Sequence, residues 1–219
     1  MATRKVSIVS RLNMVMIIDN KARIREAACD LFMQLGMRRV SMDDIAQALG
    51  MSKKTLYLYY ADKESLVEDT VDMLLKNSSV ACENCRKLAE NAIHECFLVT
   101  AVLTESMVRI NPVLIFDIQR YYPAAQKKIE KFRKEYLYKF FKTGIETGIR
   151  QELFKKDINP SLISWFRIET LSLQFQQQFV QDIDMDVISL QKELSLFFLH
   201  GLATPKGIKL IEKYKKPKI

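Results

Sequence analysis

Basic and aromatic side chains gather in one short stretch of the chain, MSKKTLYLYYADKESL, at residues 51–66. Within eleven positions it carries three lysines and three tyrosines: Lys53, Lys54, Tyr57, Tyr59, Tyr60 and Lys63. Ammonium groups and phenolic hydroxyls both donate hydrogen bonds to phosphate oxygens. The stretch therefore indicates a surface that binds a phosphate-bearing polyanion.

The charge of the whole chain agrees with such a partner. Of the 219 residues, 34 are basic and 26 are acidic, which gives a formal net charge of +8. The excess lies at the two ends, since residues 1–60 and residues 205–219 each carry +5, whereas residues 61–204 carry −2. A basic end is typical of nucleic-acid binding. We predict that residues 205–219 form a solvated basic tail.

Composition narrows the protein class. Apolar residues make up 48% of the chain, and only six glycines and five prolines interrupt it, so an all-α globular fold is expected. Four cysteines are too few for a disulfide scaffold and suit a reducing, cytoplasmic location. No apolar run approaches the ~20 residues of a membrane span, so no membrane partner is expected. Residues 1–18 are predicted to be a flexible arm.

Helical periodicity divides the remaining chain into two parts. Residues 19–66 predict a three-helix domain with a first helix from Asp19 to Leu35, which Gly36 ends. Residues 67–204 predict a larger helical domain, and about nine helices are expected in the whole chain. Its later helices are expected near residues 80–108, 112–120, 123–148, 160–182 and 186–203.

Two short helices within residues 37–63 have the spacing of a helix-turn-helix. Ala46 is small enough for the helices to cross there, Gly50 supplies the turn, and Leu56 anchors the second helix in the core. Ser41 and Ser52 stand where each helix needs an N-cap, and Asp44 completes a capping-box pattern.

The second helix of such a motif places its N-terminal residues at base edges in the major groove. Those residues here are Lys53, Lys54 and Thr55, because lysine donates to guanine acceptors and the threonine methyl can meet a thymine methyl. Ser41 and Ser52, at the two helix starts, are predicted to contact phosphates. For Ser41 this role accompanies that of a cap.

The stretch RRVSMDDIAQALGMSKKTLYLYYADKESLVEDTV resembles the DNA-binding domain of the tetracycline-repressor-like (TetR/AcrR) family of bacterial regulators. The resemblance covers about residues 20–70. It implies that Tyr57, Tyr59 and Lys63 contact DNA phosphates and that position 60, commonly Phe, packs inside. Tyr60 departs from that pattern, and its hydroxyl needs a partner.

The resemblance also implies a C-terminal domain that dimerises and holds a small-molecule effector. The helices expected at 160–182 and 186–203 carry more apolar residues than one core face needs, which predicts a homodimer. Interface candidates are Phe166, Leu173, Phe175, Phe179, Leu190, Leu194, Phe197 and Phe198. Pocket candidates are Phe97, Met107, Phe116, Tyr122, Phe140, Trp165 and Glu169. The effector's chemistry does not follow from them.

A metal site or redox sensor is the competing interpretation of the cysteines. Cys82, Cys85 and Cys96 would share one apolar face of a continuous helix, from which His94 points away. Buried, structural cysteines are therefore favoured, with no metal and no cofactor. The chain has two histidines and no glycine-rich phosphate loop, so an enzyme is not expected.

Together these features predict a DNA-binding transcriptional regulator. The expected mechanism is that of a dimeric repressor on double-stranded DNA, released from an inverted-repeat operator by a small molecule. Repression and the effector are implied by the family resemblance. The alternative is a DNA-binding regulator that a protein partner, cysteine oxidation or a metal controls.

Overall fold

The computed structural model describes residues 8–108, 110–176 and 182–215, and the side chains from Asn20 onward. These residues are mostly helical and form no β-strand, with one isolated β-bridge between Phe154 and Ala203. The all-α prediction is confirmed. No single described helix is long and apolar enough to cross a membrane, although the bent pair Ala92–Val108 and Pro112–Tyr121 meets that test by length and composition.

The chain divides into two compact units. The first comprises the residues up to Met73 together with Val113–Gln126, and the second comprises Leu74–Pro112 and the residues from Lys127 onward. The long helix α4 (Lys63–Leu88) begins in the first unit and ends in the second. The division therefore differs from the predicted boundary at residues 66 and 67, which lies inside α4.

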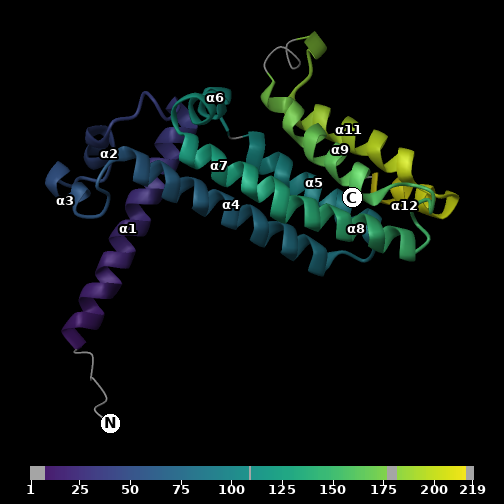
Figure 1. Cartoon of the computed structure of the whole chain (residues 1–219), viewed down its shortest axis with the longest axis horizontal. Coiled ribbons are helices and arrows are strands. Elements are labelled where there is room, and N and C mark those ends of the chain that lie inside the picture. The colour runs from purple at the N-terminus through teal and green to yellow at the C-terminus, as the bar shows by residue number, and fades with distance from the viewer. Residues whose placement is uncertain (1–7, 109, 177–181, 216–219) are drawn as a thin grey trace. The chain divides into compact units, whose positions relative to one another are not determined.

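The first unit is built around the N-terminal helix α1 (Ile8–Leu35). The short helices α2 (Met42–Ala48) and α3 (Lys53–Tyr57) follow it in the chain, and α6 (Pro112–Tyr121) joins them (Figure 1). The core of this unit includes fully buried side chains from α1, α2, α3 and the start of α4: Ile24, Phe32, Ile45, Leu56 and Leu66. The three-helix domain is thus present, with α6 as an unpredicted addition.

Helix α1 begins earlier than predicted. Its first residue is Ile8, so the described part of the expected flexible arm is helical, whereas residues 1–7 lie outside the described range. Residues 8–18 contain no glycine or proline, and nothing in their backbone chemistry ends a helix upstream of Asp19.

The second unit packs the remaining helices against one another. Helices α8 (Tyr138–Arg150) and α9 (Pro160–Ser172) are neighbours, as are α5 (Ala92–Val108) and α11 (Val187–Leu202). Helix α7 (Pro123–Lys131) leads through a π-helical segment, Phe132–Leu137, into α8. A short 3-10 turn, Leu173–Phe175, follows α9.

Two predicted helices are interrupted. The expected helix at 80–108 is divided between α4 and α5, because the Asn91 side chain accepts hydrogen bonds from the amides of Ile93 and His94 and starts a new helix. The helix expected at 160–182 ends as an α-helix at Ser172. Asn159 caps its start and Pro160 occupies its first turn, as predicted.

The predicted basic tail is wrong for residues 205–215, which form helix α12 (Pro205–Lys215). Ile211 is fully buried, and the Tyr214 hydroxyl donates to Glu90 at 2.7 Å. The Tyr214 ring also stacks on His94, with centroids 4.5 Å apart. The apolar residues of this segment recur at helical spacing, but four lysines among its eleven residues obscured that pattern.

Candidate nucleic-acid interface

Helix α2 begins with a complete capping box. The Ser41 hydroxyl accepts from the Asp44 amide at 3.1 Å, and the Asp44 carboxylate accepts from the Ser41 amide at 2.7 Å. These hydrogen bonds to Ser41 hold the pKa of Asp44 below its ordinary value of 3.8. The predicted cap is confirmed, and the exposed Ser41 hydroxyl lies at a helix N-terminus, where backbone dipoles favour anions.

The turn between α2 and α3 depends on two small residues. Ala46 is buried, and its carbonyl accepts from the Met51 amide at 3.0 Å. Gly50 has a φ of +63°, and a Cβ placed there would meet no atom within 4 Å. The glycine is therefore required by backbone conformation and not by crowding. This arrangement is the one predicted for a helix-turn-helix.

Helix α3 presents its basic residues outward. Leu56 is fully buried, whereas Lys53 and Lys54 are exposed. The Ser52 hydroxyl caps the helix by accepting from the Thr55 amide at 3.1 Å. With Leu56 buried, both lysines at the start of the helix stay in solvent.

The two lysines of α3 differ in their surroundings. Lys53 forms an ion pair with Asp43, with Nζ 2.8 Å from the carboxylate, and this contact raises the pKa of Lys53. Lys54 has no ion-pair partner within the described part of the chain. Lys54 can therefore meet an anion directly, while Lys53 must leave or share Asp43 to do so.

The predicted phosphate-contacting residues also differ in how free they are. Tyr57 is 41% exposed. The Tyr59 hydroxyl, on a half-buried side chain, accepts from Asn20 Nδ2 at 3.1 Å. Lys63 donates to the Arg38 carbonyl at 3.5 Å, and partial burial lowers the pKa of Lys63. Tyr57 is the side chain most available to a phosphate.

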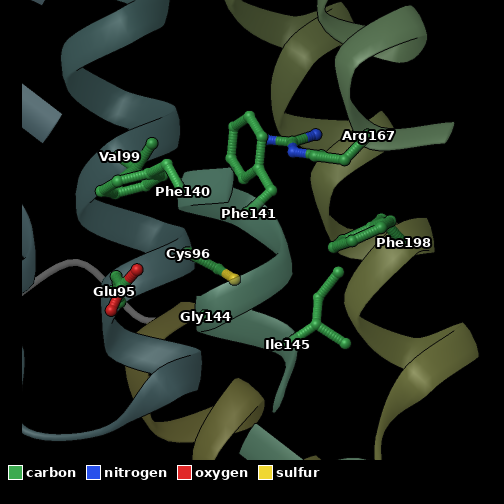
Figure 2. A pocket seen from close by; sticks show the side chains of 9 residues that line it. All are labelled: Glu95, Cys96, Val99, Phe140, Phe141, Gly144, Ile145, Arg167 and Phe198. Atoms are coloured by element: carbon green, nitrogen blue, oxygen red, sulfur yellow. The ribbon is translucent and has the colours of Figure 1, made fainter. Parts of the chain in front are cut away.

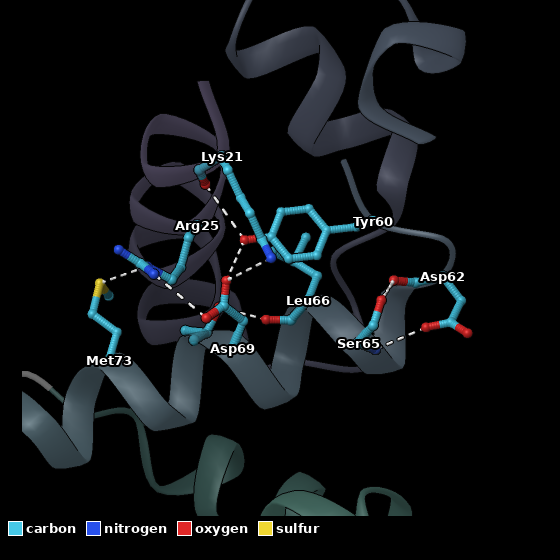
Figure 3. A network of polar contacts seen from close by, with 9 residues as sticks. Lys21, Arg25, Tyr60, Asp62, Ser65, Leu66, Asp69 and Met73 are labelled. Atoms are coloured by element: carbon cyan, nitrogen blue, oxygen red, sulfur yellow. Dashed lines mark hydrogen bonds and ion pairs between the residues drawn. The ribbon is translucent and has the colours of Figure 1, made fainter. Parts of the chain in front are cut away.

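Tyr60 points inward and takes part in a polar network (Figure 3). Its hydroxyl donates to Asp69 at 2.5 Å, and Asp69 also pairs with Arg25 at 3.4 Å and with Lys21 at 3.9 Å. Burial and the adjacent Asp69 raise the pKa of Tyr60 far above its ordinary value. The hydroxyl that distinguishes Tyr60 from phenylalanine therefore joins α1 to α4, since it also lies 3.4 Å from the Lys21 carbonyl oxygen.

Sequence reasoning missed two residues that organise this surface. Asn20 holds the Tyr59 hydroxyl, as described above. Arg38, in the loop before α2, donates its amide to Asp117 at 2.8 Å and places its guanidinium 4.7 Å from the Tyr121 ring centroid. The arginine pair preceding Ser41 was the available signal, but its partners lie 79 and 83 positions away.

The second unit contains a small cavity (Figure 2). Of the predicted pocket residues, only Phe140 is among its lining side chains. Phe97 and Met107 pack against core clusters beside it. Trp165 stacks on Tyr138, and the exposed Glu169 carboxylate pairs with Arg133 at 2.7 Å. Phe116 and Tyr122 belong to the first unit. The cavity lining is Glu95, Cys96, Val99, Phe140, Phe141, Gly144, Ile145, Arg167 and Phe198.

The predicted interface residues divide by burial. Phe166 and Phe197 are exposed, the latter by 74%. Leu190 and Phe198 are buried within the protomer, so both were wrongly assigned to a surface. Leu173, Phe175 and Leu194 are half-buried, and Phe179 lies outside the described residues. Leu162 and Ile188 add exposed apolar area on α9 and α11.

The cysteines are protected thiols. Cys82 and Cys85 are buried, and burial raises the pKa of Cys82 and that of Cys96 to about 12. A thiol with such a pKa is largely protonated near neutral pH and reacts slowly. Within the described ranges, no group of three or more His, Cys, Asp or Glu residues could hold a metal ion.

Comparison with known proteins locates the similarity in both units. Residues 24–70 match the family model for bacterial regulatory proteins of the tetR family. The HTH-type transcriptional regulator YhgD of Bacillus subtilis, itself uncharacterized, is 26% identical over 193 residues, which span 86% of this chain and 99% of that protein. An HTH-type regulator of Staphylococcus aureus is 43% identical over 49 residues, or 22% of this chain and 26% of that protein.

Solved structures share the fold at low sequence identity. A TetR/AcrR-family regulator from Thermobifida fusca superposes with a TM-score of 0.65 at 17% identity, covering 84% of this chain and 98% of that one. A transcriptional regulator from Saccharomonospora viridis, solved in complex with choline, gives 0.70 at 17% identity and covers 85% and 98%. These likenesses concern the arrangement of helices alone.

Proposed function

Because the chain belongs to the tetR family of bacterial regulatory proteins, we propose that it is a homodimeric repressor that binds an inverted-repeat operator. In this proposal α3 enters the major groove. Lys53, Lys54 and Thr55 then meet base edges. The backbone phosphates are contacted by Ser41, Ser52, Tyr57, Tyr59 and Lys63.

The observation that carries the proposal is the sidedness of α3. Leu56 is fully buried while Lys53 and Lys54 stand in solvent on a helix only five residues long. The caps at Ser41 and Ser52 and the turn at Gly50 hold this short helix and its two lysines in a fixed position, as DNA reading requires. Tyr57 and Tyr59 flank that face, at positions that suit phosphates on either side of a groove.

A homodimer accounts for the apolar surface of the second unit. Helices α9 and α11 expose Leu162, Phe166, Ile188 and Phe197, although both helices already contribute buried residues to their own core. Exposed apolar area of this kind is typical of a protein interface. A two-fold dimer would present two copies of α3, and half-sites centred one DNA turn, ~34–36 Å, apart would accept them.

The proposed regulation is release from the operator by a small molecule that binds the second unit. The Saccharomonospora viridis structure, which was solved in complex with choline, supports a small-molecule ligand in this fold. The alternative, control by cysteine oxidation or a metal, is less well supported because Cys82 and Cys85 are buried and the pKa values of Cys82 and Cys96 are raised.

Selection of bound duplexes from a random DNA pool tests the proposal. We expect enriched inverted repeats with half-sites separated by one turn, and a loss of affinity between 50 and 200 mM salt. The matched control is the Leu56→Ala variant, which removes the anchor of α3 and should abolish enrichment. Binding without any enriched sequence would contradict a sequence-specific regulator.

A further inference from the structure

Arg167 carries a positive charge deep inside the second unit. Its side chain is 3% exposed. One terminal nitrogen, Nη2, donates to the hydroxyls of Thr100 at 2.7 Å and Ser195 at 2.9 Å. The other, Nη1, is buried and has no hydrogen-bond partner. Buried charges are costly unless paired, so an arginine left in this state needs an explanation.

No carboxylate neutralises this guanidinium within the described ranges of the chain. Its neighbours are two hydroxyls, the Cys96 thiol and the Phe198 ring, whose centroid lies 5.3 Å from Cζ. Burial accordingly lowers the pKa of Arg167 to about 10, which still leaves it charged at neutral pH. The missing counter-ion is the unusual feature of this site.

The one acidic group in the cavity wall is already neutralised. Glu95 pairs with Arg86 at 2.8 Å, and Arg86 in turn donates to the Phe140 carbonyl at 2.7 Å and stacks on the Phe140 ring. The cavity therefore holds one compensated ion pair and one uncompensated cation. Its net charge is positive, which disfavours a cationic ligand and favours an anion.

The rest of the wall is apolar. Val99, Phe140, Phe141, Ile145 and Phe198 surround the space, and Arg167 reaches from α9 toward the side that Phe140 and Phe141 line (Figure 2). A π-helical segment, Phe132–Leu137, leads directly into the helix that carries both phenylalanines. Such segments are frequent at functional sites.

We propose that this cavity binds an effector with a carboxylate group and an apolar body, and that Arg167 pairs with the carboxylate. Nη1 would gain the acceptor it lacks, and the aromatic wall would cover the apolar part. The inference rests on the proposed function, since it names the class of molecule that would release the operator. The cavity of about 20 Å³ is about the size that one water needs, so binding must move the phenylalanine rings apart.

Ligand binding to the full-length protein tests this directly. Hexanoate, octanoate and decanoate are titrated by calorimetry, each beside the alcohol and the amine of the same chain length. We expect at least one carboxylate to bind and its alcohol and amine to bind at least tenfold more weakly. Equal binding of the alcohol or the amine, or no binding of any carboxylate, would overturn the assignment.

Variants separate a ligand role from a structural one. Arg167→Met should weaken carboxylate binding by about 10- to 100-fold, whereas the control Arg150→Met, at an exposed arginine of the same unit, should leave it unchanged. Since the charge is unpaired in the free protein, Arg167→Met should unfold at the same urea concentration as the natural protein or at a higher one. Unaltered binding, or a large fall in the unfolding midpoint, would contradict the proposal.

Operator binding is measured in parallel so that the two proposals can fail separately. If the protein binds no specific DNA, the repressor function is wrong, whatever the carboxylates do. If it binds specific DNA but no carboxylate, the repressor function stands and this inference is wrong. If both succeed, octanoate or its homologues should release the natural protein from DNA and leave Arg167→Met bound.

Discussion

The three lysines of the DNA-binding surface stand in three environments, and each environment implies its own contribution. Lys53 is held by Asp43, Lys54 is without an ion pair among the described residues, and Lys63 is half-buried beside the Arg38 carbonyl. A side chain fixed in position before binding loses little entropy when a phosphate arrives. Lys63 is therefore suited to fixing the protein on the backbone, and Lys54 to reading a base.

Substitution of these two lysines should have different effects. Lys63→Ala is expected to weaken binding to all duplexes alike and to reduce the slope of log K against log salt by about one. Lys54→Ala should relax the preferred base at one position per half-site, at a cost of about 1–3 kcal/mol for the best sequence. Fluorescence anisotropy over a salt series measures both.

Lys87→Ala, at an exposed lysine of the second unit, is the control and should change neither quantity. If Lys54→Ala retained the natural sequence preference, the assignment of Lys54 to base reading would be wrong.

Tyr60 illustrates a residue whose unusual hydroxyl serves folding. Tyr60→Phe removes the donor to Asp69 but keeps the buried ring. Because the lost hydrogen bond involves a charged acceptor, the free energy of unfolding should fall by about 1.5–3 kcal/mol. Urea denaturation followed by circular dichroism measures the change.

The matched variant is Tyr57→Phe. The Tyr57 ring is exposed, and the family resemblance assigns its hydroxyl to a DNA phosphate. It should leave the unfolding free energy unchanged and weaken DNA binding. The reverse pattern, with Tyr60→Phe affecting only DNA affinity, would show that the Tyr60 hydroxyl faces the phosphate instead.

At the scale of elements, the capping box of α2 links helix formation to pH. Asp44 has a lowered pKa in the folded protein, so its ionised form stabilises the fold. That contribution is complete above pH 3.8, the ordinary pKa, and is lost as the pH falls through the lower folded value.

Asp44→Asn should therefore be less stable than the natural protein at pH 7, because a neutral amide replaces a charge-assisted acceptor at a positive helix end. The difference should shrink steadily below pH 3.8. Thermal melts between pH 2.5 and 7 measure it. A difference independent of pH would mean that the carboxylate's charge plays no part.

At the scale of the whole molecule, the proposed dimer carries two copies of α3, and its proposed contact lies on the exposed apolar residues of α9 and α11. Phe197→Glu places a charge on each side of that two-fold contact without disturbing the protomer core, since Phe197 is exposed. We expect the dissociation constant of the dimer to rise roughly 100-fold and the affinity for an inverted repeat to fall as a result.

Sedimentation velocity over a concentration series measures the assembly. Leu88→Glu, at a similarly exposed apolar residue near the end of α4, is the control and should leave the dimer intact. A Phe197→Glu protein that stays dimeric would place the interface elsewhere.

Local chemistry determined much of this protein from sequence alone. The caps at Ser41 and Ser52, the left-handed turn at Gly50 and the buried anchor at Leu56 each depend on residues within a few positions of one another. The helix-turn-helix and its exposed lysines could therefore be predicted, because neighbours in the chain decide hydrogen bonds and sidedness there.

Tertiary structure decided what depends on distant partners. Apolar composition did not distinguish the buried Phe198 from the exposed Phe197, since only packing decides which of two adjacent rings faces the core. Helix α12 is held in place by hydrogen bonds of the Tyr214 hydroxyl with Glu90 and Asn91, which lie more than 120 positions earlier in the chain. Nothing near Arg167 in the sequence indicates that it is buried. Its surroundings are decided by α5 and α11, which bring Thr100 and Ser195 to its guanidinium. Burial and charge pairing are properties of the assembled helices, which no local pattern contains.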